Sequence, residues 1–498
     1  MKTVPLSIEE WQKERIKEEE IMPFLKEGGD FIKEDLIRKA INKDYKPDRK
    51  KLEEILAKAL AIETLSLEEL SYLMSLKDSQ SWARMEETAL AIKRRVYNNR
   101  IVTFAPLYLG NFCVNSCLYC GFRKENSQIE RKILSRAEIK QETEVLAGEI
   151  GHKRLIVVYG EHPQTDLSYI KESIETIYKV KVKTKNGWGQ IRRVNVNAPP
   201  LNLEELRELK KVGLGTYQVF QETYHHATYK RVHPTGTIKH NYLWRLYTMH
   251  RAFKAGIDDV GIGVLFGLYD WRFEVMALLL HAQELEKEFG IGPHTVSFPR
   301  LEPALNTPFA SGSSWRLSDE DFRKVVILIR LSIPYTGMII TAREPKRIRE
   351  ESLRWGITQT DASSRIGIGS YKQGVMRQEE KKQQFILGDE RSLDELVGDL
   401  ADKGIITSFC TAGYRCGRTG KRIMELLRSG QEGIFCKLNA ILTFREWIDD
   451  FASGSTYQKA LLLLEKEREE VRCRYGQYFP LLEEYYHRIS RGERDLFF

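Results

Sequence analysis

Three cysteines close together, Cys113, Cys117 and Cys120, constrain this chain more than any other feature. They stand in the run CVNSCLYC with the spacing Cys-x3-Cys-x2-Cys, and the nearest histidine is His152. Three thiolates can hold a cubane iron–sulfur cluster and leave one iron without a protein ligand. An open position of this kind is typical of catalytic metal sites, whereas structural sites are closed. The alternatives are three buried thiols or a structural zinc site, which normally needs a fourth ligand nearby.

Length and charge set the broad class of the protein. The chain has 498 residues, which is too many for one simple domain but suits a barrel with extensions. Hydrophobic residues make up 42%, enough for a sizeable core. The 78 basic and 70 acidic residues are mixed along the chain, so the net charge of +8 indicates a solvated surface. We therefore expect no nucleic-acid partner.

The same sequence predicts a cytoplasmic protein without a membrane partner. The N-terminal run MKTVPLSIEEWQKERIKEEE is densely charged and has no apolar stretch of signal-peptide length. The longest apolar runs, such as 275–280, are too short to cross a bilayer. Seven cysteines is an odd count, which favours metal binding in a reducing compartment over a disulfide framework.

Periodicity divides the chain into three parts. Residues 1–95 are predicted to form a helical N-terminal extension, in which Ser66 and Glu69 make a capping box. Strand-like apolar runs then alternate with amphipathic helices, the clearest of which starts at Ser135 with Glu138 three residues on. Eight such runs occur, at 101–109, 154–160, 192–198, 216–223, 259–267, 294–300, 337–344 and 356–364.

This alternation predicts an α/β fold, a parallel (β/α)8 barrel of TIM type over residues 96–384, with an open α/β sheet as the alternative. Residues 385–498 are predicted to form a mostly helical C-terminal domain. Chemistry in such barrels lies at the C-terminal ends of the strands. Because the cysteine loop directly follows the first strand, we expect the cluster at that end.

Two further segments carry candidate residues. YGEHP ends the second strand and supplies Glu161 and Gly160, a residue that suits close backbone approach. In QVFQETYH, on the fourth strand, alternation points Gln218, Phe220 and Glu222 to one face. Polar residues this dense on a central strand are costly unless partnered. Ligand contact and an internal polar network are both consistent with this pattern.

The sixth run, HTVSFPR, carries three candidates, and one more follows the cysteines. Arg300 lies toward the end of the run and is predicted to point at the catalytic mouth, where a guanidinium can clamp a carboxylate. Ser297 lies toward the same end. His294 starts the strand, at the bottom of the barrel, where a structural role is an equal alternative. Phe122 suits loop packing or cofactor contact equally well.

A second group of cysteines lies in the predicted C-terminal domain: Cys410, Cys416 and Cys436. Their proximity in sequence suggests a second cluster or another metal, with buried unpaired thiols as the alternative. Cys473 is isolated and is interpreted as helix packing.

With these motifs together, the chain resembles the tyrosine-lyase branch of the radical-SAM enzymes. Within that branch it is most similar to the FeFe-hydrogenase maturases, with the tyrosine lyases of thiamine synthesis as relatives. The resemblance extends over residues 101 to about 450 and is carried by CLYCGFRKEN, YGEHP, GTYQVFQETYH, AGIDDVGIGVLFGLYD, GPHTVSFPR, SFCTAGYRCGRTG and FCKLNAILTFREW.

The resemblance implies both cofactors and chemistry. A 4Fe-4S cluster on Cys113, Cys117 and Cys120 would reduce S-adenosylmethionine with an electron from an external one-electron reductant. The resulting radical would start cleavage of the Cα–Cβ bond of L-tyrosine to p-cresol and dehydroglycine. By match, Ser297 and Arg300 would hold the tyrosine carboxylate. The residues placed near S-adenosylmethionine are Tyr119, Phe122, Gly160, Glu161, Gln221 and Glu222.

The resemblance also implies a second stage. Dehydroglycine would pass down the barrel to a second iron–sulfur cluster and become carbon monoxide and cyanide for hydrogenase H-cluster assembly, with a maturation scaffold as partner. His294 would serve the extra iron there. The family pattern has cysteines matching 410, 413 and 436, but residue 413 is Gly413, and Cys416 is the nearby alternative. If that cluster does not form, the reaction stops at dehydroglycine. Rival interpretations are a radical-SAM RNA modifier and an iron–sulfur scaffold protein.

Overall fold

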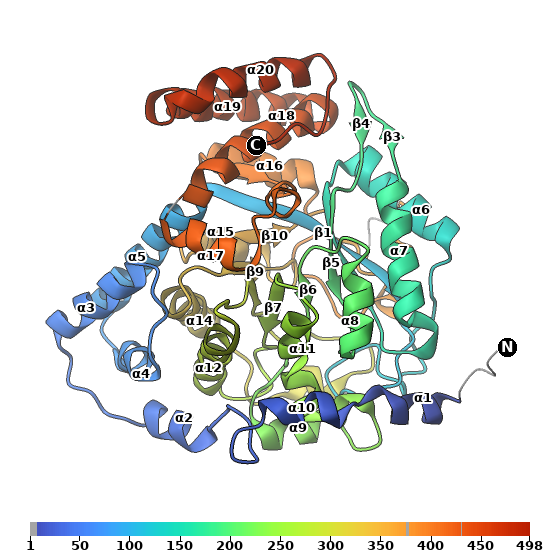
Figure 1. The fold of residues 1–498 in the computed structure, drawn as a ribbon, viewed down its shortest axis with the longest axis vertical. Coiled ribbons are helices and arrows are strands. Elements are labelled where there is room, and N and C mark those ends of the chain that lie inside the picture. Colours follow the sequence, from blue (N-terminus) through green and yellow to red (C-terminus); the bar gives the residue numbers. More distant parts are fainter. Residues whose placement is uncertain (1–6, 375–377, 430) are drawn as a thin grey trace.

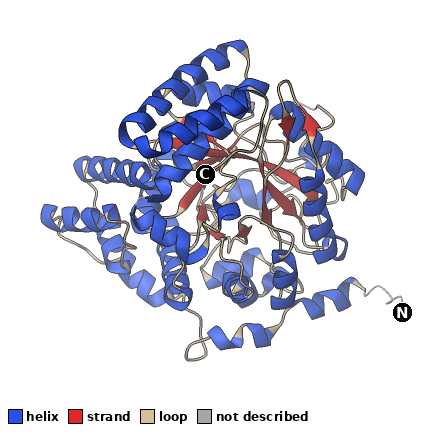
Figure 2. Cartoon of the chain, turned by 45° about the horizontal axis from the view of Figure 1, so that its top comes forward, coloured by secondary structure: helices blue, strands red, loops and turns tan. Residues whose placement is uncertain are grey.

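The computed structural model describes residues 7–374, 378–429 and 431–498. Eight parallel strands close into a barrel at its centre, because the last strand pairs with the first at Thr360 and Thr103. Helices surround this ring (Figures 1 and 2). All eight predicted strands are confirmed, as β1 (Arg100–Gly110), β2 (Arg154–Tyr159), β5 (Arg193–Asn197), β6 (Tyr217–Gln218), β7 (Val260–Gly263), β8 (Thr295–Ser297), β9 (Gly337–Ile340) and β10 (Gln359–Asp361).

The helices that connect the strands bury their apolar faces against the barrel. Ser135 and Glu138 form the predicted capping box at the first of them. The outer ring consists of α6 (Arg136–Val145), α7 (Leu167–Lys179), α8 (Leu203–Lys210), α9 (His226–Val232), α10 (Tyr242–Leu246), α11 (Thr248–Lys254), α12 (Trp271–Phe289), α14 (Asp319–Ser332) and α15 (Lys346–Ser352). A short hairpin, β3 (Val182–Lys183) with β4 (Trp188–Gly189), stands apart from the barrel.

The fourth barrel strand is much shorter than predicted. Regular pairing in β6 ends at Gln218. Beyond it, main-chain hydrogen bonds from Val219 to Gly261 (3.4 Å) and from Gln221 to Gly263 (3.1 Å) and an isolated bridge from Glu222 to Val264 continue the contact with β7. Glu222 has φ +72°, a left-handed conformation that interrupts a strand. The run 216–223 is therefore an irregular strand end at the barrel mouth, which is where side chains are free to face a ligand.

The N-terminal extension wraps the barrel from its mouth to its base. Its helices are α1 (Ile8–Arg15), α2 (Glu34–Ile41), α3 (Arg49–Leu60), α4 (Leu67–Ser75) and α5 (Ser79–Tyr97). The predicted capping box of Ser66 and Glu69 starts α4. Arg15 fastens α1 through an ion pair with Glu205 and a 3.2 Å hydrogen bond to the carbonyl oxygen of Pro200. Helix α5 leads directly into β1.

The C-terminal part packs on the opposite end of the barrel from α1 (Figure 1). It contains α16 (Leu393–Asp402), β11 (Ile406–Ser408), α17 (Gly420–Ser429), α18 (Gln431–Phe451), α19 (Gly454–Arg474) and α20 (Phe479–Ser490). Strand β11, which sequence analysis missed, pairs with the start of β1 from Arg100 to Val102. Buried Glu446 of α18 forms ion pairs with Lys153 (3.1 Å) and Arg192 (2.8 Å), which lie next to the starts of β2 and β5. Among the described residues, no helix has both the length and the apolar character to cross a bilayer.

A histidine joins the N-terminal wrap to the barrel. His226 contacts Asp30 through Nε2 at 2.8 Å and Glu34 through Nδ1 at 2.6 Å. Two carboxylate partners require both ring nitrogens to donate, which only the imidazolium can do. Burial lowers the pKa of His226, but these hydrogen bonds outweigh burial and leave the pKa raised. Neighbouring His225, which contacts Arg38 at 2.7 Å, has its pKa lowered by burial.

The attachment of the wrap should therefore weaken as the pH rises above the ordinary histidine pKa. The raised pKa of His226 stabilises the folded chain fully below the ordinary histidine pKa, and this contribution disappears as the pH rises through the raised value. Limited proteolysis between residues 16 and 48 should accelerate over that pH range. In His226→Gln the cleavage should be fast throughout and lose this pH dependence; an unchanged pH profile in the variant would contradict the assignment.

Candidate functional site

The cysteine loop leaves β1 at the mouth of the barrel and is held by one arginine. Arg131 donates hydrogen bonds to the carbonyl oxygens of Asn111 (2.6 Å), Phe122 (2.8 Å), Arg123 (2.6 Å) and Asn126 (3.4 Å). Four carbonyls on one guanidinium bring the two ends of the loop together without using any cysteine. All three cysteines are free thiols.

The end of β2 presses against the same loop. The amide of Val114 donates to the carbonyl oxygen of Glu161 at 2.8 Å, and the amide of Gly160 donates to Gly110 at 2.9 Å. A Cβ at Gly160 would overlap the carbonyl oxygen of Phe112. The glycine is thus needed for close approach, as predicted, but the group that approaches is the cysteine loop itself.

A cavity of about 220 Å³ lies at the mouth, between the loop and the strand ends. It brings together most of the predicted site: Cys113, Cys117, Cys120, Tyr119, Phe122, Gly160, Glu161, Glu222 and Ser297 all line it. Gln221 does not; its side chain is buried on the other face, and its amide has no hydrogen-bond partner among the described residues. The neighbouring Phe220 and Glu222 line the cavity instead, and contact of Gln221 with a cofactor stays a prediction.

Charged side chains are concentrated on one wall of this cavity. Glu222 accepts from Lys239 Nζ at 2.8 Å and lies 3.4 Å from Arg245 Nη2. Burial raises the pKa of Glu222, but the two cations outweigh burial and hold it below its ordinary value. The pKa of Glu161, in contrast, is raised, because burial outweighs the groups that would lower it. Its Oε2 accepts from Asn115 at 2.6 Å, while its buried Oε1 has no partner among the described residues.

Arg300, the predicted carboxylate clamp, does not line the cavity, and its role in binding a carboxylate stays a prediction. The Arg300 guanidinium makes a bidentate ion pair with buried Glu344 and a 2.8 Å bond to Asp319. Arg343, which follows β9, lines the cavity instead. No carboxylate of the described residues lies within ion-pair distance of Arg343, and the guanidinium packs 3.3 Å from the ring centre of Phe385.

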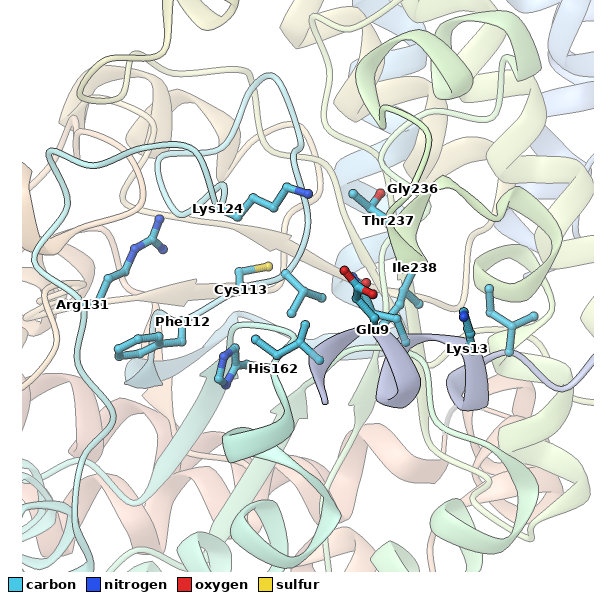
Figure 3. A pocket seen from close by; sticks show the side chains of 14 residues that line it. Glu9, Lys13, Phe112, Cys113, Lys124, Arg131, His162, Gly236, Thr237 and Ile238 are labelled. Atoms are coloured by element: carbon cyan, nitrogen blue, oxygen red, sulfur yellow. The ribbon is translucent and has the colours of Figure 1, made fainter. Parts of the chain in front are cut away.

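A wider cleft of about 850 Å³ reaches the cysteine loop from outside. Figure 3 shows Cys113 in this cleft, with Lys124 and Arg131 on one side and His162 on the other, and with α1, which carries Glu9 and Lys13, crossing nearby. Cys113 lines both hollows, so they meet at this thiol.

The three thiols fit an iron–sulfur cluster better than a single metal ion. Among the described residues, no group of three His, Cys, Asp or Glu side chains could hold one ion. A cubane cluster needs something different, because each thiolate binds its own iron. Burial raises the pKa of the Cys113 thiol and raises that of Cys117 to about 12, so metal binding must displace their protons.

Comparison with known proteins agrees with this geometry. A model of the Radical SAM superfamily matches residues 107–280, and one of the Biotin and Thiamin Synthesis associated domain matches residues 297–406. The 2-iminoacetate synthase of Escherichia coli is 30% identical over 371 residues, covering 74% of this chain and 92% of the relative.

Two solved structures match more of the chain. A crystal structure of HydG, a maturase of the FeFe-hydrogenase, is 44% identical with a TM-score of 0.88, covering 94% of this chain and 100% of its own. HydG from Carboxydothermus hydrogenoformans is 39% identical with a TM-score of 0.77, covering 91% and 98%. The chain belongs to the radical-SAM superfamily, in the branch of HydG and 2-iminoacetate synthase. The expected family and the barrel fold are confirmed.

The second group of cysteines differs from the first in this radical-SAM protein. Cys410 follows β11 with φ +47°, and Cys416 ends the short helix Gly413–Cys416. The thiol of Cys416 donates to the main-chain oxygen of Phe498 at 3.6 Å. Cys436 lies on α18. Among the described residues, these three thiols do not form a group that could hold a single metal ion, and whether they hold a cluster stays a prediction.

His294 lies immediately before β8, at the base of the barrel, as predicted. Burial lowers its pKa, so the imidazole is neutral, and Asp258 and Asp259 are near enough to oppose that shift. Thr419 donates to Asp258 at 3.0 Å, which brings the segment after Cys416 to the same end of the barrel. The position suits the predicted role of His294, which stays a prediction.

Several site residues carry no local sequence signal. Lys239 lies in the short helix Ile238–His240, Arg245 on α10 and Arg343 in the loop after β9, and the sequence around each resembles any charged surface segment. Their position after a barrel strand was the available clue, because loops after strands form the mouth. Only the folded chain shows which of these cations turn inward.

Replacing all three cysteines of the loop by alanine should abolish the iron of the first site. Anaerobic reconstitution followed by iron and sulfide analysis would measure it. Cys473→Ala, a change at an exposed cysteine on α19, is the control and should keep its full iron content. Iron retained by the triple variant would show that Cys410, Cys416 and Cys436 bind metal themselves; full retention would contradict the cluster assignment.

Proposed function

We propose that this protein is a radical-SAM lyase that cleaves the Cα–Cβ bond of L-tyrosine to p-cresol and dehydroglycine. The observation that carries the proposal is the cavity at the barrel mouth, which is lined by three thiols and by Arg343, a cation with no carboxylate within ion-pair distance among the described residues. Dehydroglycine is 2-iminoacetate, the product named for the Escherichia coli relative.

The cavity supplies what an aromatic amino acid requires. Arg343 and Ser297 would bind the carboxylate, since a buried guanidinium without a carboxylate partner gains most from one. Phe104, Ile156 and Ile339 form an apolar layer inside the barrel that borders the same cavity and suits the phenol ring. This arrangement replaces the role first predicted for Arg300.

Cys113, Cys117 and Cys120 would hold a 4Fe-4S cluster, and the free Oε1 of Glu161 and the close backbone at Gly160 suit the amino acid part of S-adenosylmethionine. When bound, this pair supplies the one-electron chemistry that starts the reaction. The protein's part is to position both molecules, to exclude water with Phe122, and to balance charge with Glu222. An external one-electron reductant would approach through the cleft at Cys113.

A second candidate function adds conversion of dehydroglycine to carbon monoxide and cyanide, for H-cluster assembly with a maturation scaffold. The similarity of this chain to HydG supports this second function, and so does the position of His294 at the base of the barrel. Two observations favour release of dehydroglycine instead: Gly413 has no thiol, and that of Cys416 is turned to Phe498. A protein that only carried iron–sulfur clusters to others would need neither the cavity at the barrel mouth nor Arg343 in its lining.

One assay separates these functions. After anaerobic reconstitution, reductant, S-adenosylmethionine and tyrosine should yield 5′-deoxyadenosine and p-cresol in equal amounts. Carbon monoxide trapped in the same tube would support the second candidate, whereas its absence beside p-cresol would identify a lyase that stops at dehydroglycine. Failure to form 5′-deoxyadenosine under all conditions would rule out both and favour a scaffold.

Arg343→Ala should lower kcat/KM for tyrosine by roughly tenfold to a hundredfold, as a hydrogen-bonded ionic contact of about 1.5–3 kcal/mol predicts. The slow cleavage of S-adenosylmethionine without tyrosine is the internal control and should persist. Arg343→Lys, which keeps the charge but not the fork, should lose less. Equal tyrosine kinetics in Arg343→Ala and the native protein would remove this residue from the substrate site.

A further inference from the structure

A glutamine far from the cysteines in sequence contacts one of their thiols. Gln384 lies in the loop between β10 and α16, and its Nε2 donates a hydrogen bond to Cys120 Sγ at 3.3 Å. The one other side-chain donor to the three thiols among the described residues is Asn115, 3.7 Å from Cys113 Sγ and already bound to Glu161. Among the described residues, the hydrogen bond from the amide of Gln384 is therefore the shortest that a side chain donates to these three sulfurs.

The orientation of the amide is determined by its second partner. Tyr108 donates its hydroxyl to Gln384 Oε1 at 3.1 Å. Burial raises the pKa of Tyr108, so the phenol stays protonated and keeps this donor role. With Oε1 engaged in this way, the NH2 group faces Cys120. The reverse orientation would place a carbonyl oxygen against a thiolate, two acceptors with no proton between them.

The backbone keeps Gln384 in this position. The amide of Gly121, next to Cys120, donates to the carbonyl oxygen of Gln384 at 3.2 Å. A Cβ at Gly121 would lie 2.6 Å from that oxygen, so the contact depends on glycine. Phe385 and Leu387 of the same loop line the cavity. The loop that closes the cavity thus also reaches the cysteine loop through main chain and side chain.

We propose that Gln384 is a positioning residue for the first cluster: its N–H···S hydrogen bond to the Cys120 thiolate raises the reduction potential of that cluster. A donor stabilises negative charge on sulfur, and this charge grows when the cluster gains an electron. Removal of the donor should therefore make reduction harder. The inference rests on the proposed cluster at Cys113, Cys117 and Cys120 and is independent of whether tyrosine is the substrate.

The adjacent Gln383 offers a matched control. It is buried in the same loop, but its Nε2 donates to Gln378 (2.8 Å) and to the carbonyl oxygen of Phe385 (3.0 Å) and to none of the three thiols. Gln383→Leu disturbs the loop without touching the sulfur. Any shift seen in Gln384→Leu beyond that of Gln383→Leu reports the hydrogen bond to Cys120.

The test is a redox titration of the reconstituted protein with dithionite, followed by the electron paramagnetic resonance of the reduced cluster, without tyrosine. At the midpoint potential of the native protein, Gln384→Leu should show about tenfold less reduced than oxidised cluster, which for one electron corresponds to a midpoint lower by about 59 mV. Iron and sulfide content should match the native protein. A midpoint equal to that of the native protein or of Gln383→Leu would overturn the proposal.

Two further variants decide the question if Gln384→Leu loses its cluster. Gln384→Glu keeps the size but places a carboxylate oxygen at the sulfur, and should lower the midpoint. Tyr108→Phe removes the group that orients the amide, and should lower the midpoint less than either change at Gln384. Unchanged midpoints in both would overturn the proposal. Absence of any reducible cluster in the native protein would instead refute the proposed function, so the two failures are distinguishable.

Discussion

The site depends on one close approach, between the end of β2 and the loop that leaves β1. Gly160 lies so near the carbonyl oxygen of Phe112 that no side chain fits, and the Val114 amide is bound to Glu161 across the same contact. This pairing extends the barrel ladder past its regular end. It turns the loop over the mouth, and Arg131 then closes it by collecting four carbonyl oxygens. Because these main-chain contacts hold both ends of the loop, its three thiols face one cavity.

Buried charge determines what that cavity can hold. Lys239, Arg245 and Arg343 face it, while Glu222 is held ionised by the first two. The lining also holds three carboxylates, Glu161, Glu222 and Asp361, but among the described residues none lies within ion-pair distance of Arg343. A buried cation of this kind is costly until an anion joins it. A cluster with thiolate ligands and amino acids with carboxylates both meet that need. Arg343 is thus the cation of the lining that, among the described residues, is left for the carboxylate of a ligand, in the same cavity as the three thiols.

Sequence reasoning succeeded where a short-range pattern has one structural outcome. Alternating apolar runs predicted all eight strands, and the cysteine spacing predicted the cluster loop at the end of the first. It failed where the partner of a side chain comes from elsewhere in the chain. Arg300 was placed at the mouth by its position on the strand, but Glu344, after the following strand, pairs with it. Strand β11 was missed because it lies in a mostly helical segment outside the strand–helix alternation, and its partner, Arg100–Val102, lies far earlier in the chain.

The sequence alone therefore determined the barrel, the cysteine loop and the place of chemistry at the strand ends. These follow from periodicity and from which residues are neighbours along the chain. Only the tertiary structure decided that Arg343 rather than Arg300 faces the cavity, that Gln384 donates to Cys120, and that the Cys416 thiol turns to Phe498. The physical reason is that each of these depends on the direction of a side chain and on a distant partner, and sequence spacing encodes neither.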